Sequence, residues 1–171
     1  MRTQSPCLST GRLTTGVKSI SRWLLASALA VLLPGIVGAQ PTTTRVSVGP
    51  GGVQGNDDSI RSASISADGR WVVFDSYASN LVTEGTTGGL NVFVYDQQTG
   101  TTTRASVGLS GAQANGRSEA WGLSSDGRWV LFASYATNLV AADTNGEPDV
   151  FVHDQQTGAT TRVSVPRSWR W

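Results

Sequence analysis

Residues able to do acid–base or nucleophilic chemistry are scarce in this sequence. Among its 171 residues there is one histidine, His153, and one cysteine, Cys7. A Ser-His-Asp hydrolase needs a histidine to accept the proton of its serine. The position that matches His153 in an internal repeat is Tyr95, which cannot act as that base. We therefore interpret His153 as an amphipathic strand residue and predict no catalytic residue.

Oxygen-bearing side chains gather in one short stretch, Asp143-Thr144-Asn145-Gly146-Glu147-Pro148-Asp149. Oxygen ligands at alternate positions, with a glycine at the bend, are typical of calcium loops. The stretch lacks part of the full loop pattern, and its counterpart at residues 84–91 has lost most of the oxygens. Two interpretations stay open: a calcium site formed by Asp143, Asn145 and Asp149, or a plain surface turn. No other cofactor is predicted.

Two further acids recur at matching places, and both sit in turns. Asp68 and Asp126 each precede a glycine, and in such turns an aspartate accepts hydrogen bonds from nearby backbone amides. Arg70 and Arg128 follow the two turns. We expect each arginine to pair with a nearby acid or a backbone carbonyl, so these four residues are assigned structural roles.

The elements that must position these residues come from an internal duplication. Residues 65–104 and 123–162 match without a gap at 26 of 40 positions. A third, partial copy at residues 43–48 echoes residues 102–107 and 160–165. A repeat with this period predicts a fold built from similar units that stack on one another.

Each copy contains four strand-like pieces separated by turn signals. The predicted strands are Ser62–Ser66, Trp71–Phe74, Val92–Tyr95 and Thr101–Val107, then Ala120–Ser124, Trp129–Phe132, Val150–His153 and Ala159–Val165. Valine, threonine and aromatic residues favour strands because their side chains suit a pleated surface. The second and third pieces are apolar at consecutive positions, which is typical of strands covered on both faces. We therefore predict an all-β fold.

A repeated four-stranded sheet with covered central strands is typical of the blade of a β-propeller. The alternatives are a β-sandwich or a solenoid, and the sandwich gives no reason for such close repetition. Residues 66–74 and 124–132 resemble the Ser-x-Asp-Gly-x-x-hydrophobic-x-Phe signature of TolB-like, WD-repeat-like propeller blades, and residues 149–158 resemble the corner of that family. The resemblance covers residues 43–165 and implies a partial β-propeller of two four-stranded antiparallel blades.

The repeat also predicts the domain boundaries. They are an orphan N-terminal strand of a preceding blade at 40–48, a first blade at 49–107, a second at 108–165 and an irregular tail at 166–171. Two blades do not close a ring, because propellers have four to eight. We expect either a truncated family member or a homo-oligomer in which roughly three or four copies complete the propeller.

Residues 1–39 are predicted to form a signal peptide. Four basic residues and no acidic one precede the apolar stretch 23–37, and small residues lead to a cleavage site between Ala39 and Gln40. The alternative is a membrane anchor, but the apolar run of about 15 residues falls short of the ~20 that cross a bilayer. The mature chain is therefore predicted to be secreted or periplasmic, with no membrane span.

Composition bears on the remaining function classes. With 39% hydrophobic residues, a net charge of +1 and no Lys/Arg block, the chain is neither a disordered polymer nor a nucleic-acid binder. Residues 40–171 carry nine Arg, no Lys and twelve Asp or Glu, a net charge of −3, and no Cys. Their fold must therefore depend on core packing rather than on disulfides.

These observations favour a non-enzymatic module that binds a protein or a glycan through loops at one rim. The connection Tyr77–Gly89 is the longest loop, and we expect its Asn80-Leu81-Val82 segment to fold against the sheet. Two alternatives stay open. One is a remnant of a larger propeller-containing hydrolase or lyase that has lost its catalytic domain, and the other is a self-assembling structural ring.

Overall fold

The computed structural model describes residues 42–164, and this part of the chain is all β with almost no helix. Two short 3₁₀ turns, Pro50–Gly52 and Leu109–Gly111, are its only helical elements. The predicted signal peptide, its cleavage site and the tail at 166–171 lie outside the described residues.

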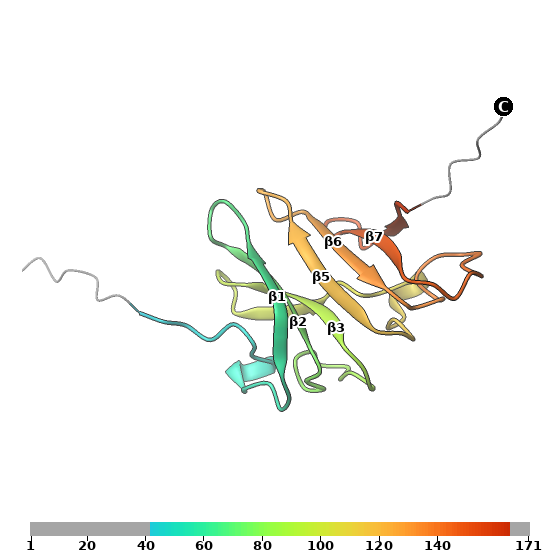
Figure 1. Ribbon diagram of the computed structural model, residues 1–171. Coiled ribbons are helices and arrows are strands. Elements are labelled where there is room, and N and C mark those ends of the chain that lie inside the picture. The colour runs from blue at the N-terminus through green and yellow to red at the C-terminus, as the bar shows by residue number, and fades with distance from the viewer. Residues whose placement is uncertain (1–41, 165–171) are drawn as a thin grey trace, which may run out of the picture. The chain divides into compact units, whose positions relative to one another are not determined.

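Eight strands form two antiparallel sheets, each with its strands in chain order (Figure 1). Sheet 1 consists of β1 (Ser59–Ile65), β2 (Trp71–Ser76), β3 (Asn91–Asp96) and β4 (Thr101–Arg104). Sheet 2 consists of β5 (Ser118–Leu123), β6 (Trp129–Ser134), β7 (Asp149–Asp154) and β8 (Thr160–Arg162). The prediction of an all-β fold with a four-stranded antiparallel sheet in each repeat is confirmed.

The two sheets share one register. Trp71 lies opposite Asp96 across β2 and β3, and Trp129 lies opposite Asp154 across β6 and β7. The fourth strand of sheet 1 is shorter than predicted and ends at Arg104. Its ladder stops there because the next two amides, those of residues 105 and 106, both donate to one carbonyl oxygen in β3.

Alternation along the strands gives each sheet two faces, which we call face A and face B. Face A of sheet 1 carries Val72, Phe74, Phe93 and Tyr95, and its face B carries Trp71, Val73 and Val94. Face A of sheet 2 carries Val130, Phe132, Phe151 and His153, and its face B carries Trp129, Leu131 and Val152. In sheet 1, β3 is buried at all of its positions, as the consecutive apolar residues predicted.

Face B of sheet 1 packs against face A of sheet 2. Strand β5 contacts β1, β2 and β3 (Figure 1), and one hydrophobic cluster joins Val73 and Val94 to Phe132 and Phe151. Burying an apolar side chain of this size contributes roughly 1.5–3 kcal/mol, so this shared core holds the two repeats together. Face A of sheet 1 is instead covered in part by its own loop and by residues 46 and 48.

The segment predicted as an orphan strand takes a different form where it is described. Residues 42–47 form no strand, and Val48 makes a single antiparallel bridge with Gln54. The Val48 carbonyl accepts a hydrogen bond from Thr102, which ties the segment to sheet 1. The matching residues 102–107 include the end of β4 and the two positions after it that bond to β3. Residues 42–164 include no sheet before sheet 1 with which residues 43–48 could pair in this way.

Candidate functional site

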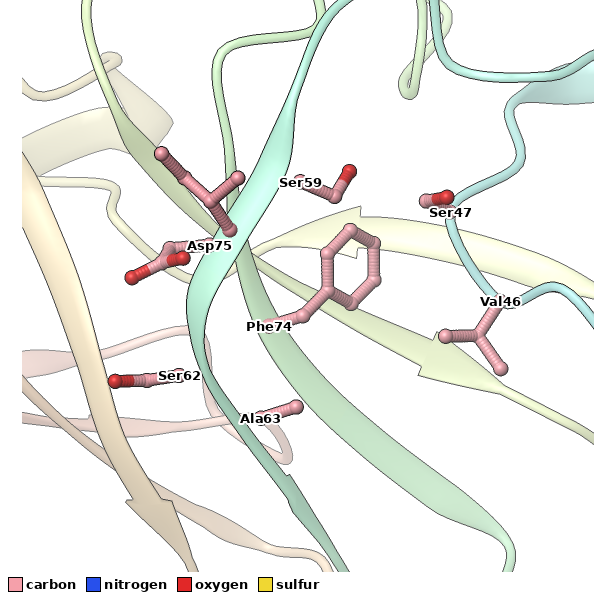
Figure 2. A pocket seen from close by; sticks show the side chains of 8 residues that line it. Val46, Ser47, Ser59, Ser62, Ala63, Phe74 and Asp75 are labelled. Carbon is pink, nitrogen blue, oxygen red and sulfur yellow. The ribbon is translucent and has the colours of Figure 1, made fainter.

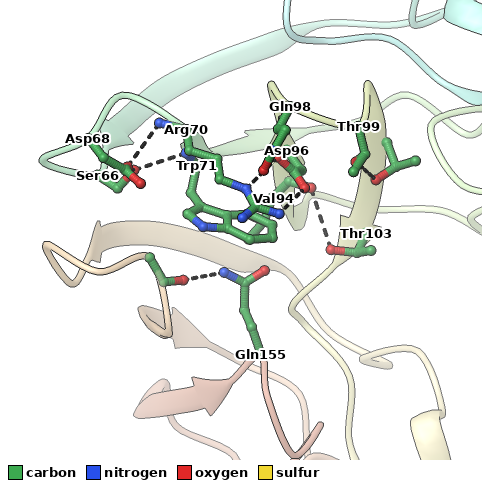
Figure 3. Close-up of polar contacts among 12 residues, drawn as sticks. Ser66, Asp68, Arg70, Trp71, Val94, Asp96, Gln98, Thr99, Thr103 and Gln155 are labelled. Carbon is green, nitrogen blue, oxygen red and sulfur yellow. Dashed lines mark hydrogen bonds and ion pairs between the residues drawn. The ribbon is translucent and has the colours of Figure 1, made fainter.

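Each sheet begins its second strand with the same polar turn, drawn for sheet 1 in Figure 3. Ser66 Oγ donates to Asp68 Oδ1 at 2.5 Å and accepts from the Trp71 amide at 2.9 Å, while the Arg70 amide donates to Asp68 at 3.0 Å. Gly69 closes the turn at φ 74°, a conformation that favours glycine. The bonds recur with the same lengths in Ser124, Asp126, Arg128 and Trp129. The predicted turn role of both aspartates is confirmed.

The arginine after each turn forms a two-pronged ion pair with the end of the third strand. Arg70 Nε and Nη2 lie 2.9 and 2.8 Å from the two carboxylate oxygens of Asp96. This contact holds the pKa of Asp96 well below its usual value of 3.8. Arg128 and Asp154 repeat the pair at the same distances. The prediction that both arginines pair with acids is confirmed.

The two sheets differ in what covers the tryptophan beside this ion pair. The Arg70 guanidinium lies over the Trp71 ring, 4.5 Å from its centroid. A Cβ placed on Gly127 would lie 2.1 Å from Cδ1 of that ring, so Trp71 packs directly against the turn of sheet 2. Trp129 also has its arginine at 4.6 Å, but it is 43% exposed. Face B of sheet 2 therefore presents an aromatic ring that no neighbouring sheet covers within residues 42–164.

His153 is packed inside the fold. It is 6% exposed, and its Nδ1 lies 3.0 Å from Thr160 Oγ1. Burial lowers the pKa of the imidazole below 6.5, which favours the neutral ring. Thr160 also donates to the carbonyl of Val107, so the histidine supports the connection between the sheets. This is the environment of the amphipathic strand residue that the sequence predicted.

The residues of the predicted calcium site are engaged with other groups. Arg162 Nη1 lies 3.3 Å from Asp143 Oδ1 and 3.0 Å from Asp149 Oδ2. The hydrogen bond from Ser164, and to a smaller extent the contact with Arg162, lowers the pKa of the Asp149 carboxyl below its usual value. Asn145 Oδ1 accepts a hydrogen bond from a backbone amide in its own turn, 3.2 Å away.

A calcium ion at Asp143 and Asp149 would compete with the guanidinium that already lies against both carboxylates. Among residues 42–164, no three His, Cys, Asp or Glu side chains are placed to hold a metal ion. Asparagine is not one of these four residue types, so the calcium site that includes Asn145 stays a prediction. The sequence pattern did not point to Arg162, which sits on the last described strand.

The long connections of each sheet leave from the strand ends opposite to the polar turns. Asn56 accepts from the Ser79 amide at 2.8 Å and donates to its hydroxyl at 2.9 Å, which fixes the start of the Tyr77–Gly89 loop. Leu81 within this loop is fully buried, and its counterpart Leu139 is 1% exposed. The prediction that the Asn-Leu-Val segment folds against the sheet is confirmed, and the loop has a fixed base.

A groove of about 440 Å³ opens where this loop meets residues 113–117. Gln113 Oε1 accepts from the Thr87 amide at 3.1 Å, and its Nε2 donates to the Thr87 carbonyl at 2.7 Å. Gly88, Asn115 and Arg117 line the rest. Amide and guanidinium groups suit a ligand rich in hydroxyls or carbonyls. The sequence offered no motif for this groove, because its two walls come from different repeats.

Two other hollows lie on the outward faces of the two sheets, and their exposed lining is mainly apolar. Figure 2 shows the hollow on sheet 1, where Phe74 and Ala63 lie beside Val46. The hollow on sheet 2 is lined by Trp129, Leu131 and other residues of β5–β7. The two hollows belong to the two faces that have no neighbouring sheet among the described residues.

Comparison of the chain with protein-family models and with curated proteins gave no match. Within residues 42–164, no helix is long and apolar enough to cross a membrane.

Proposed function

We propose that this chain is a non-enzymatic repeat module of the β-propeller type, secreted or periplasmic. It binds a protein or glycan through the long loops at one end of its sheets. The observation that carries the proposal is the way in which the two repeats stack. Face B of one sheet covers face A of the next, with Trp71 seated on Gly127. Radial stacking of four-stranded sheets, face to face, is the arrangement of propeller blades.

The groove between the Tyr77–Gly89 loop and residues 113–117, here called the loop groove, is the proposed binding site, because its walls are held in place without a ligand. Gln113 joins the two walls through both ends of its amide, and Asn56 fixes the base of one of the connections. Loops held on a rigid sheet scaffold commonly carry recognition. Hydroxyl, amide and guanidinium side chains line the groove together with Ala114 and three glycines. This mixture of hydrogen-bonding and small apolar groups favours a glycan or an extended peptide.

A binding screen with matched variants tests this proposal. The full chain is offered to a glycan array and to a peptide display library, and the hits are then titrated by calorimetry. We expect Gln113→Ala to weaken a true hit about tenfold, the effect of losing one or two hydrogen bonds. Gln54→Ala is the control, since Gln54 forms the matching backbone bridge in the first repeat but does not line the groove. Hits whose affinity does not change when Gln113 or Arg117 is replaced by alanine would contradict the proposal.

A further inference from the structure

We propose that face B of sheet 2 docks against face A of sheet 1 in a second copy of this chain. In this head-to-tail contact, Trp129 of one copy packs on Gly69 of the next. The inference rests on the propeller-type stacking proposed above, and it does not involve the loop groove. The contact inside the chain, Trp71 on Gly127, is its template.

Face B of sheet 2, which we call the donating face, is exposed at the positions that are buried in the contact inside the chain. Val73 is fully buried at the internal interface, whereas its counterpart Leu131 is 36% exposed. Trp71 is half-buried against Gly127, whereas Trp129 is 43% exposed. The same apolar face has therefore been duplicated, but within residues 42–164 only the first copy of it is covered by another sheet.

Face A of sheet 1, which we call the receiving face, is likewise more exposed than the matching face of sheet 2. Ala120, which pairs with Phe132 on face A of sheet 2, is 1% exposed under sheet 1. Ala63, which pairs with Phe74 at the same place in sheet 1, is exposed. Ile65 pairs with Val72 at the end of β1 and is 56% exposed. Ala63 also lines the hollow in Figure 2, beside Phe74. A recess thus lies where sheet 1 would receive another sheet; its exposed lining is mainly apolar, and Asp75 and three serines also line it.

Gly69 is the most specific part of this receiving face. It has φ 74°, against 77° for Gly127, so the two turns present the same backbone. A Cβ on Gly127 would collide with a tryptophan ring, whereas a Cβ on Gly69 would meet nothing within 4 Å. Gly69 therefore offers the space that a tryptophan takes up on Gly127, and the chain carries one further tryptophan at the matching position, Trp129.

A second copy is the occupant that continues an interface already present in the chain. The turn that would receive Trp129 reads Ser66-Ala67-Asp68-Gly69, and the turn that receives Trp71 reads Ser124-Ser125-Asp126-Gly127. The arginine beside each tryptophan is already paired with its aspartate, so packing of the tryptophan on the turn leaves neither arginine without its counter-charge. Contacts of this heterologous kind close into rings or extend into filaments.

Sedimentation velocity of the full chain over a concentration series tests the proposal. We expect wild-type protein to form multimers as concentration rises, and Leu131→Arg to weaken this association at least tenfold. Leu109→Arg is the matched control, because Leu109 is 63% exposed on a turn outside both faces. A wild-type chain that stays monomeric at its highest soluble concentration overturns the proposal, as does equal association of the two variants.

Cross-linking gives a readout that does not depend on the folding of Leu131→Arg. Inside the chain the Ala67 amide donates to the Ser125 carbonyl at 2.9 Å, so these two positions meet across a stacked pair of sheets. In a Cys7→Ser background, Ala67→Cys and Ser125→Cys are made as separate full-length proteins and treated with a short bis-maleimide. Head-to-tail docking predicts a covalent dimer in the mixture and none in either protein alone.

Dimers in a single-variant sample, or none in the mixture, overturn head-to-tail docking. Binding of a glycan to Trp129 in place of self-association is a further outcome that overturns it. Gln113→Ala should associate like wild type, because its groove lies apart from both faces. Failure of the loop-binding proposal and failure of the docking proposal are therefore distinguishable.

Discussion

Two glycine substitutions isolate the packing of Trp71 on the next sheet. Gly69 and Gly127 occupy the same turn position at φ 74° and 77°. A residue with a side chain pays about 1–2 kcal/mol in this left-handed region, so both Gly→Ala variants carry that cost. At Gly127 the new Cβ would also lie 2.1 Å from the Trp71 ring, whereas at Gly69 it meets nothing within 4 Å.

Overfilling a packed contact costs roughly a further 1–3 kcal/mol. We therefore expect Gly69→Ala to lower the free energy of unfolding by about 1–2 kcal/mol and Gly127→Ala by about 2–5 kcal/mol. Urea denaturation of the full chain measures both values. The series is made in a Leu131→Arg background, so that self-association does not contribute to either value. Equal losses of stability in the two variants would refute the packing of Trp71 on Gly127.

Three further predictions concern the ionisable groups. Because Arg70 holds the pKa of Asp96 below 3.8, the ionised Asp96 stabilises the fold above that pH and this contribution disappears as pH falls through the lower folded pKa. Urea denaturation at about pH 5, 4, 3 and 2 should show a smaller acid-induced loss of stability in Asp96→Asn than in wild type. Because burial lowers the pKa of His153, the unfolded chain takes up this proton first and wild-type stability should fall as pH drops below 6.5. His153→Tyr, which copies the matching residue of sheet 1, should flatten this slope, and an unchanged slope would contradict the buried neutral ring. A saturable calorimetric signal with Ca²⁺ would support the predicted calcium site, and Arg162→Gln should then bind more tightly because Arg162 competes for the carboxylates. The absence of heat from both proteins at millimolar Ca²⁺ would remove the site.

The duplication made most of the strand plan predictable. Two stretches that match in chemically varied residues must form similar sheets, and the consecutive apolar residues of β3 indicated burial on both faces. The structural roles of Asp68 and Arg70 were predictable because Asp-Gly turns have known chemistry. These features depend on residues that are near one another in the chain.

Features that depend on contacts between the repeats were not predictable. Val73 and Leu131 occupy matching positions of the two repeats, yet one is buried and the other is partly exposed. The reason is that, within residues 42–164, only sheet 1 has a sheet against its face B. Gln113 became a candidate binding residue only once the structure placed it across from the Tyr77–Gly89 loop. Arg162 similarly reaches Asp143 and Asp149 only through the pairing of the last two strands.

The proton shifts of two glycines in an NMR dilution series test the central claim most directly. A tryptophan ring shifts the protons of a backbone stacked against it. We predict that the α-protons of Gly127 are displaced at every concentration, and that those of Gly69 move toward the same displaced position as concentration rises. Gly127 shifts typical of an uncovered turn, or Gly69 shifts that stay constant up to the solubility limit, would contradict the account.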